Sequence, residues 1–515
     1  MAAELVVRPV PHRRGPAPGP GAGAGPEEAS MRLSELLVRA DPDRSPSLAG
    51  DPVVRGIRND SRAVRPGDLF VALRGLAADG ADYVGDALRR GAVAVFSERR
   101  LSLPPSIPLV VDPRGRRAVA RLAAAFHREP ATRLRCVGVT GTNGKTTTTW
   151  IVRRLLEASG VRTALVGTIG HDVGDAEERA TRTTPDAVEL QELLARAVEN
   201  GHEAAAMEVS SHALTQDRVH GIPFDAAVFT NLTRDHLDYH GTMEEYAAAK
   251  GRLFAGLRRG AVAVLNADDP ASARYAKATP ARVVRYGLRA ADADVTARDV
   301  AAGTSGSFFR LVWPDGELAI ETPLVGLYNV ANALAAAATA RALGCSDHAI
   351  REGLRALPPV PGRLERVDAG QPFLVVVDYA HTPDALANVL RALRPIARRR
   401  VLALFGCGGD RDRGKRPEMA RAAGEGADFV VVTSDNPRTE DPSRILADVV
   451  PGLPAGCDHR VVEDRREAIA EILRRAEPGD VVLLAGKGHE TYQILRDATI
   501  PFDDRRVAWE LLTEE

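Results

Sequence analysis

Beyond residue 30, the chain alternates short apolar runs with stretches of helical periodicity. Apolar runs at residues 68–73 and 92–96 enclose an amphipathic stretch that reaches Gly91. Strands separated by helices favour parallel pairing, because a parallel neighbour needs a crossover connection. Residues 31–130 are therefore expected to form a small α/β domain.

A second series of apolar runs starts at residues 135–140, whose pattern is that of a buried strand. Residues 147–157 have the period of a helix, which Gly160 closes. Further strands are expected at residues 204–207, 226–229 and 261–265. These runs predict a central domain, residues 131–358, with a mainly parallel sheet and helices on both faces.

The same alternation starts again after a proline-rich linker at residues 358–362. The strands of this third series are expected at residues 373–377, 401–405, 429–432 and 481–485. Residues 359–515 should thus form a third α/β domain. A chain of 515 residues has room for such a three-domain α/β fold.

Composition excludes several classes of function. The net charge of −1 provides no field that would attract nucleic acid or an anionic membrane. No apolar run reaches the roughly 18 residues that a membrane span needs. The four cysteines make no CxxC pair, which argues against a disulfide framework and a zinc site. We expect a cytoplasmic monomer without membrane insertion.

The first thirty residues differ from the rest of the chain. They are rich in Pro, Gly and Ala, and no apolar segment follows Arg13 and Arg14, so they do not resemble an export signal. Such a composition cannot bury enough apolar area to offset its ordering entropy. We expect residues 1–30 to be a disordered leader, with Met31 opening the folded part.

Lysine is rare in this sequence, with five lysines against sixty-three arginines. A lysine kept under such a bias is expected where a guanidinium cannot replace a compact, chemically modifiable ammonium. Four of the five lie in polar motifs: Lys145, Lys250, Lys415 and Lys487. The fifth, Lys277, lies in an Ala-rich stretch and needs no special explanation.

Polar clusters follow the predicted strands at their carboxyl ends, where open α/β sheets bind their ligands. They lie at residues 140–147, 208–212, 231–236, 378–381, 406–411, 434–438 and 486–490. The first has the composition of a phosphate-binding loop that enters a helix, although Val139 occupies the first glycine position of the strict motif. Its candidate ATP-binding residues are Gly141, Thr142, Asn143, Gly144, Lys145, Thr146 and Thr147.

A magnesium nucleotide also needs hard oxygen ligands. Thr146 offers a hydroxyl, and Glu208 and His236 lie just beyond strands of the same sheet. A single Glu or His at a strand end is as often a cap or a solvated side chain. By pattern alone, Lys250 is a lysine on the face of a helix, near its start.

Taken in order, these motifs, with residues 328–332 between them, resemble the Mur ligase family. The resemblance covers residues 31–515 and implies a uridine-nucleotide-binding domain, a central P-loop ATPase and a Rossmann-like C-terminal domain. It places Asn329 and Arg363 near ATP. It also implies contacts to a UDP-muramoyl dipeptide, UDP-N-acetylmuramoyl-L-alanyl-D-glutamate, by Asn59, Ser61, Thr183, Thr184, Ser210, Gln216 and Arg218.

The resemblance further implies an ATP- and Mg²⁺-dependent ligase that activates a carboxylate as an acyl phosphate for peptidoglycan biosynthesis. The catalytic residues would be Lys145, Glu208, His236 and Lys250. Lys250 would be modified to N6-carboxylysine and would bind the metal together with Thr146, Glu208 and His236. The D-N-P-R sequence is that of members that add meso-diaminopimelate. It implies an amino-acid site made of Arg411, Asp435, Asn436, Pro437, Arg438, Gly486 and Glu490.

Two other functions are compatible with parts of the pattern. Folylpolyglutamate synthases have a similar phosphate loop, but the complete first domain and the D-N-P-R sequence argue against them. A regulatory protein that keeps the ATP fold without turnover is the second alternative. The presence of Lys145, Glu208, His236 and Lys250 argues against it.

Overall fold

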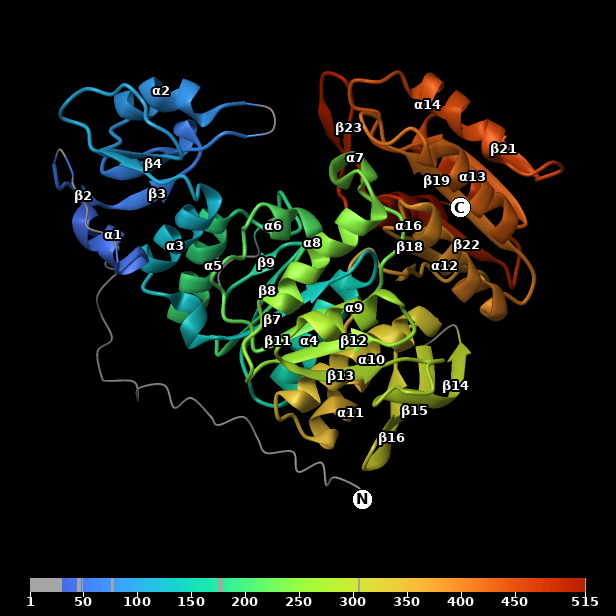
Figure 1. The fold of residues 1–515 in the computed structure, drawn as a ribbon. Coiled ribbons are helices and arrows are strands. Elements are labelled where there is room, and N and C mark those ends of the chain that lie inside the picture. The colour runs from blue at the N-terminus through green and yellow to red at the C-terminus, as the bar shows by residue number, and fades with distance from the viewer. Residues whose placement is uncertain are drawn as a thin grey trace.

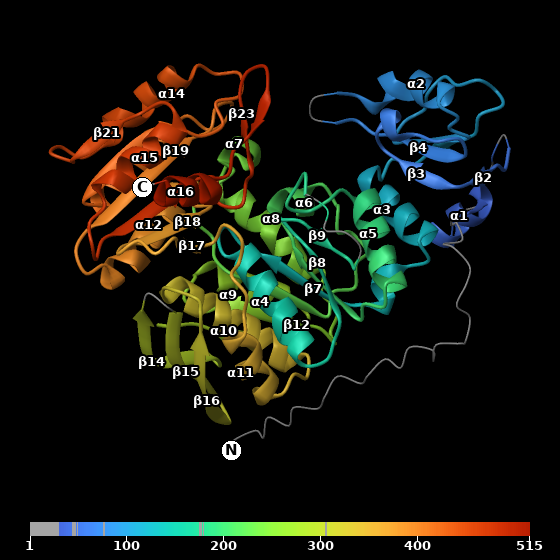
Figure 2. The ribbon, with the colours of Figure 1, turned by 180° about the vertical axis from the view of Figure 1, so that it is seen from behind.

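The computed structural model describes residues 30–514, except 44–47, 49, 76–77, 175–177, 179 and 304–305. The leader predicted for residues 1–30 lies outside the described residues, apart from Ser30. Three α/β domains follow one another along the chain, which confirms the predicted fold class (Figure 1). Figures 1 and 2 show the first and third domains on opposite sides of the second. Within the described residues, every helix is too short or too polar to span a membrane.

The N-terminal domain is built on a parallel sheet. Across this sheet the strands are β3 (Gly56–Arg58), β4 (Asp68–Ala72), β5 (Ala94–Ser97) and β6 (Leu109–Val111). Its helices are α1 (Leu33–Ala40), α2 (Val84–Arg89) and α3 (Arg116–Phe126). Leu69 and Val71 of β4 face α1 and α3, while Phe70 faces α2, as alternation along a strand requires. A short pair, β1 (Met31–Arg32) and β2 (Val53–Val54), lies beside α1.

The central domain has a larger sheet that is parallel except at β9. Its strands, in spatial order, are β13 (Arg282–Tyr286), β12 (Val262–Asn266), β11 (Ala226–Phe229), β7 (Arg135–Thr140), β10 (Ala204–Glu208), β8 (Thr163–Val166) and β9 (His171–Asp172). One face packs on α4 (Lys145–Ala158), α10 (Leu327–Ala342) and α11 (Asp347–Arg355). The other packs on α5 (Ala187–Glu199), α8 (Met243–Ala255) and α9 (Ala271–Ala278). The short helices α6 (Ser211–Thr215) and α7 (Leu237–His240) follow β10 and β11.

The sequence prediction missed an antiparallel sheet in the central domain. It consists of β14 (Thr296–Gly303), β15 (Gly306–Trp313) and β16 (Gly316–Thr322). The alternation was present in β15, where Phe309, Leu311 and Trp313 are buried while Phe308 and Arg310 are exposed. These buried side chains join the core of α10 and α11, which the short alternating segment alone could not indicate.

The C-terminal domain repeats the doubly covered sheet. Its strands, in spatial order, are β17 (Glu365–Val367), β18 (Leu374–Asp378), β22 (Val481–Ala485), β19 (Val401–Cys407), β20 (Phe429–Ser434) and β21 (His459–Val461), with only β17 antiparallel among these. Its helices are α12 (Pro383–Leu393), α13 (Lys415–Gly426) and α14 (Pro442–Val449) on one face, and α15 (Arg465–Arg475) and α16 (Asp504–Thr513) on the other. The hairpin β23 (Tyr492–Ile494) and β24 (Thr499–Pro501) follows β22.

Several predicted boundaries were wrong by one or two residues; the helix predicted from residue 147, for example, begins at Lys145. Strands β19 and β20 each run two residues further than expected, because Gly406 pairs with Thr433 and Cys407 with Ser434. Lys250 lies in the second half of α8, not near its start, because Thr242 caps that helix at Glu245 N.

Candidate active site

The predicted polar clusters lie on two sheet edges. We call residues 140–147, 208–212 and 231–236 the central edge, and residues 378–381, 406–411, 434–438 and 486–490 the C-terminal edge. Each segment follows or ends a parallel strand of its sheet.

The loop that joins β7 to α4 has the shape of a phosphate-binding loop. Gly141 and Gly144 have positive φ angles of 155° and 82°, and Gly144 directly precedes the first turn of α4. A side chain at Gly141 would collide with the Thr230 hydroxyl. Thr230 Oγ1 and Asn231 Nδ2 brace the loop by donating to the Asn143 carbonyl, at 2.6 and 3.1 Å. A glycine-rich turn at a helix N-terminus favours a bound phosphate.

Two lysines meet at the carbonyl oxygen of Gly141. Lys145 Nζ lies 3.0 Å and Lys250 Nζ 2.8 Å from this oxygen, and Lys145 Nζ also donates to Thr142 O at 2.8 Å. Burial lowers the pKa of both lysines, and the charge of Lys145 lowers that of the fully buried Lys250 further. Within the described residues, neither ammonium forms an ion pair with a carboxylate. The central edge therefore has positive charge available for an anionic ligand.

A buried carboxylate lies beside the phosphate loop. Glu208 accepts hydrogen bonds from Thr146 Oγ1 at 3.0 Å, Thr168 N at 2.7 Å and Thr168 Oγ1 at 3.1 Å. The Thr146 hydroxyl also accepts a hydrogen bond from Arg363 Nη2 at 3.0 Å, which brings the domain linker to the loop. A carboxylate and a hydroxyl are hard donors of the kind that Mg²⁺ binds.

His236 lies on the same edge with a positive φ of 54°. Its ring is 4.8 Å from that of His212 and 6.2 Å from that of Tyr246, whose ring lies 4.4 Å from Lys250 Nζ. Burial lowers the pKa of His236 to about 4, so its imidazole is neutral at pH 7, as a metal ligand must be. The described residues contain no cluster of three or more His, Cys, Asp or Glu placed to hold a metal. A metal here would thus need further oxygen ligands.

Asn329 and Asn332 lie beneath the phosphate loop. Asn332 Nδ2 donates to Asn329 Oδ1 at 3.1 Å, and Asn332 Oδ1 accepts from Thr148 Oγ1 at 3.3 Å. A Cβ atom at Gly144 would lie 2.5 Å from Asn332 Oδ1. The buried Asn329 thus reaches the loop through Asn332.

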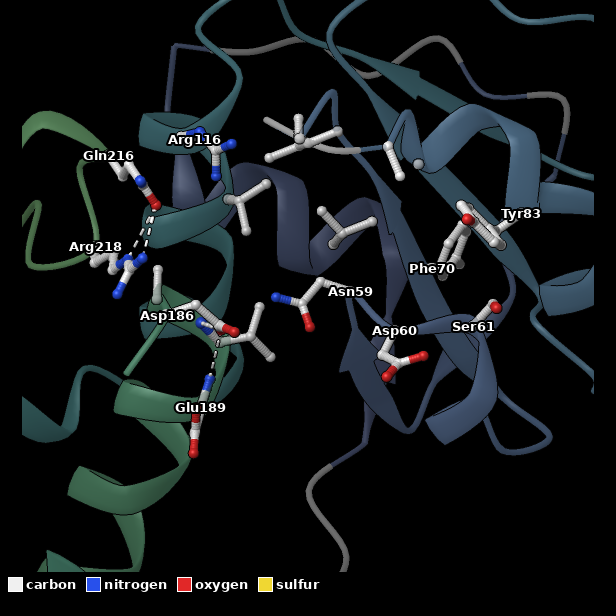
Figure 3. Close-up of a pocket in the computed structure, with 18 of the residues that line it drawn as sticks. Asn59, Asp60, Ser61, Phe70, Tyr83, Arg116, Asp186, Glu189, Gln216 and Arg218 are labelled. Atoms are coloured by element: carbon white, nitrogen blue, oxygen red, sulfur yellow. Dashed lines mark hydrogen bonds between the residues drawn. The ribbon is translucent and has the colours of Figure 1, made fainter. Parts of the chain in front are cut away.

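A cavity of about 940 Å³ separates the N-terminal and central domains (Figure 3). Asn59 and Ser61 line it from the first domain, and Gln216 and Arg218 from the second, so the structure brings these predicted residues together. The sequence reasoning missed further lining residues, namely Phe70, Tyr83, Arg116, Asp186 and Glu189. An aromatic wall and arginines on the opposite side suit a ligand that has a ring and phosphates.

Thr183, Thr184 and Ser210 are not among the described residues that line this cavity. Thr184 is fully buried, and its hydroxyl donates to Glu208 O at 2.8 Å and accepts from Ser210 N at 3.0 Å. Arg218 Nη1 in turn donates to Thr184 O at 2.7 Å. These contacts connect the cavity wall to the backbone of Glu208, the residue whose carboxylate lies beside the phosphate loop.

The D-N-P-R segment forms a folded turn on the C-terminal edge. Asn436 Nδ2 donates to Glu490 Oε2 at 2.9 Å. Arg438 has a φ of 53°, and its Nη1 donates to Gly409 O at 2.9 Å. Pro437 is buried between them. The turn thus brings Glu490 and Arg438, groups of opposite charge, onto one edge.

Arg411 and Gly486 lie on either side of this turn. Arg411 is exposed, and its Nη1 donates to Asp410 O at 3.0 Å, whereas Arg438 is only half-buried. Gly486 is buried beside the Asp435 carboxylate, and its N–H donates to Asp378 O at 3.0 Å. The predicted residues therefore share one region, with Arg411 at its outer rim.

The two edges face one another. Asn143 Nδ2 donates to Asp384 Oδ2 at 3.0 Å, and Arg234 pairs with Glu418 at 3.0 Å, in each case from the central to the C-terminal domain. Together with the Arg363 contact to Thr146, these bonds place the phosphate loop opposite the C-terminal edge. A group bound at the phosphate loop would thus face the C-terminal edge.

Known proteins show the same three-part organisation. Family models match in order: "Mur ligase family, catalytic domain" at residues 53–127, "Mur ligase middle domain" at 139–340 and "Mur ligase, glutamate ligase domain" at 362–488. A Geobacillus thermodenitrificans protein named UDP-N-acetylmuramoyl-L-alanyl-D-glutamate–2,6-diaminopimelate ligase is 51% identical over 485 residues, covering 93% of this chain and 98% of that protein. The chain belongs to the Mur ligase family.

Other Mur ligases agree in sequence and in fold. The protein of the same name from Solibacter usitatus is 48% identical over 489 residues, which cover 94% of this chain and 98% of that protein. A solved structure of a ligase of this name is 37% identical, with a TM-score of 0.67, and covers 94% of this chain and 99% of its own. The similarity therefore spans all three domains.

Sequence reasoning assigned no role to several buried charges of this Mur ligase. Lys487 is buried among Asp435, Asn436 and Glu490. Arg465 and Asp504 form a fully buried pair at 2.6 Å. The rarity of lysine signalled Lys487, but arginine is too common in this chain for Arg465 to stand out.

Proposed function

We propose that this Mur ligase is an ATP-dependent enzyme that adds meso-diaminopimelate to UDP-N-acetylmuramoyl-L-alanyl-D-glutamate in peptidoglycan biosynthesis. The observation that carries the proposal is the phosphate loop facing the C-terminal edge, the edge on which the D-N-P-R turn lies. The names and full-length similarity of the relatives support the same reaction.

Each domain has one task in this proposal. Residues 31–130 bind the uridine nucleotide, residues 131–358 bind ATP, and residues 359–515 bind the amino acid. The cavity between the first two domains suits the UDP-sugar, with Asn59, Ser61, Gln216 and Arg218 as contacts. Thr183, Thr184 and Ser210 would hold the dipeptide end. Because the Thr184 side chain is buried, it would act through its hydrogen bond with Ser210. The leader, 1–30, has no role, and the enzyme acts as a cytoplasmic monomer.

The reaction has two steps. The D-glutamyl carboxylate attacks the γ-phosphorus of ATP, which forms an acyl phosphate and releases ADP. The amine of diaminopimelate then attacks the acyl carbon, phosphate leaves, and the amine loses a proton. Lys145 and the backbone of residues 141–147 would hold the phosphates, with Asn329 and Arg363 beside the nucleotide, so that negative charge is stabilised as it moves.

Mg²⁺ fits the donors on the central edge. Thr146, Glu208, His236 and a carbamylated Lys250 would hold it, and its role when bound is to neutralise and orient phosphate oxygens. A buried lysine amine with a lowered pKa has the lone pair that reaction with CO₂ requires. The carbamate would turn a repelled cation into an anionic oxygen ligand. Arginine could not undergo this conversion.

We assign the selection of diaminopimelate to residues of the C-terminal edge. Diaminopimelate differs from lysine by a second carboxylate, and Arg438 offers a guanidinium that can bind it bidentately. Arg411 would assist from the rim, Glu490 would receive an ammonium group, and Asp435, Asn436, Pro437 and Gly486 would shape the pocket. An enzyme that adds lysine would have no need of a cation at this position, because lysine has no second carboxylate.

The proposal is tested by phosphate release with single omissions. We expect release from ATP only when the UDP-muramoyl dipeptide, meso-diaminopimelate and Mg²⁺ are all present. Turnover with a folate and glutamate in their place would favour a folylpolyglutamate synthase. Nucleotide binding without release under any of these conditions would favour a regulatory protein.

A further inference from the structure

Lys487 is a fully buried cation for which the proposed reaction has no direct use. Its side chain has no exposed surface, so its ammonium cannot touch a substrate in this structure. It lies in the G-K-G turn after β22, where Gly486 and Gly488 have φ angles of 112° and 52°. A Cβ atom at Gly488 would lie 2.6 Å from Tyr379 Cβ, so the turn packs tightly and keeps Lys487 directed inward.

The ammonium of Lys487 meets the groups that form the D-N-P-R pocket. Nζ lies 3.2 Å from Asn436 Oδ1, 3.3 Å from Glu490 Oε2 and 3.5 Å from Asp435 Oδ1. A tetrahedral ammonium has three donors for three such acceptors, whereas a planar guanidinium needs more space and a different arrangement. This fits the retention of lysine in a chain that otherwise uses arginine.

Asp435 and Glu490 both depend on this cation. Asp435 Oδ1 is buried and has no hydrogen-bond partner within the described residues, so Lys487 at 3.5 Å is its nearest compensation. Two carboxylates that share one buried region repel each other unless a cation lies between them. Without Lys487, we expect the Glu490 side chain to turn away from Asp435.

Glu490 is also held in a fixed orientation. Its Oε2 accepts from both Lys487 Nζ and Asn436 Nδ2, and within the described residues no donor is bonded to Oε1. The Glu490 side chain keeps 14% of its surface exposed, and Oε1 is the oxygen that these contacts leave for an incoming ammonium group.

We propose that Lys487 is a positioning residue for the amino-acid substrate: it holds the Glu490 carboxylate in the orientation that receives an ammonium group of the incoming diamino acid. This inference rests on the proposed function. It assigns Lys487 to capture of the amino acid and not to activation of the carboxylate, so the two steps should respond differently when Lys487 is changed.

The experiment separates the two half-reactions in the full-length protein. Hydroxylamine traps the acyl phosphate as a hydroxamate when ATP and the UDP-muramoyl dipeptide are supplied without an amino acid. We expect Lys487→Met to form hydroxamate within about twofold of wild type, while its KM for meso-diaminopimelate rises about tenfold or more and its KM for ATP stays unchanged. Lys277→Met, at an exposed lysine on α9, is the matched control and should alter none of these values.

A double variant tests whether Lys487 acts through Glu490. If it does, Lys487→Met combined with Glu490→Gln should raise the KM for meso-diaminopimelate no more than Glu490→Gln alone. Additive effects would overturn the proposal, as would an unchanged KM in Lys487→Met.

Two controls test whether the loss of Lys487 only damages the fold: thermal unfolding of each variant and a second neutral variant, Lys487→Gln. An equal loss of hydroxamate formation and of folding in both neutral variants would make Lys487 a core residue and overturn the proposal. A wild-type protein that forms no hydroxamate would instead contradict the proposed function.

Discussion

The central and C-terminal edges have the same architecture but treat buried cations differently. On the central edge, Lys145 and Lys250 share the Gly141 carbonyl and have no ion-pair partner within the described residues. On the C-terminal edge, Lys487 lies between Asp435 and Glu490. Without a carboxylate partner, Lys145 can meet a ligand's negative charge and Lys250 can react as a neutral amine, whereas the compensated Lys487 fixes the shape of a pocket. In our proposal, the first edge is accordingly the site for phosphate and the second the site for the amino acid.

The largest effect is expected at the central edge. Lys250→Ala should lower kcat by about a thousandfold or more, because it removes a proposed Mg²⁺ ligand and leaves a cavity beside the phosphate loop. Steady-state phosphate release measures this. A short carboxylate or bicarbonate should restore part of the activity. Lys250→Arg should be inactive, since a guanidinium forms no carbamate, and full turnover by it would contradict the assignment.

The second largest effect is expected in the free energy of unfolding, when a compensated buried charge beside the C-terminal edge loses its partner. Asp504→Ala leaves Arg465 as a buried, unpaired charge beside the carbonyls of Ser434 and Ala485, at a cost of about 3–5 kcal/mol in the free energy of unfolding. Urea unfolding gives the value. The pair of the exposed Arg506 and the half-buried Glu510 on the same helix is the control, and Arg506→Ala should change stability by less than about 0.5 kcal/mol. Equal effects would show that the buried pair has no special weight.

The third effect is expected in the preference for meso-diaminopimelate over lysine. Lysine would leave Arg438 without an anion in a partly dry pocket, a mismatch of about 2 to 4 kcal/mol or roughly 30- to 1000-fold. The ratio of kcat/KM for meso-diaminopimelate and lysine measures it, in wild type and in Arg438→Ala. We expect a strong preference in wild type that the variant largely loses. A preference kept in full would remove Arg438 as the selector.

The smallest effect is expected at Glu440, which braces the turn behind Arg438. Its hydrogen bond from the buried Arg416 lowers the pKa of Glu440 to about 2. Because the folded-state pKa lies below the ordinary value near 4.5, this stabilisation is present above pH 4.5 and is lost as the pH falls towards 2. Glu440→Gln should cost about 1–3 kcal/mol at pH 7 and clearly less at pH 3. Urea unfolding at both pH values would refute this if the difference stayed constant.

The fold was largely predictable where local pattern and burial agree. Strands such as β7, β11 and β22 are continuous apolar runs buried on both faces, so the sequence shows them directly. The sheet of β14, β15 and β16 was missed because its short alternating pattern depends on packing against α10 and α11. Long-range packing, not local propensity, decided that region.

The candidate site was predictable to the level of which residues share an edge. The positions of Gly141, Glu208 and Asp435 after predicted strands indicated the site, because the loops at the carboxyl ends of parallel strands lie on one side of the sheet. The sequence could not show that Lys145 and Lys250 share one carbonyl, or that Thr184 is buried behind the cavity. Such contacts join residues that are distant in sequence and depend on how the helices and sheets pack.

In the proposed mechanism, the central edge activates a carboxylate by transferring phosphate to it. The direct test supplies the UDP-muramoyl dipeptide with ¹⁸O in its D-glutamyl side-chain carboxylate, together with ATP and meso-diaminopimelate, and measures the mass of the released phosphate. We expect one ¹⁸O atom in each phosphate, because the carboxylate oxygen that attacks phosphorus leaves with it. Unlabelled phosphate alongside amide product would contradict the acyl-phosphate route.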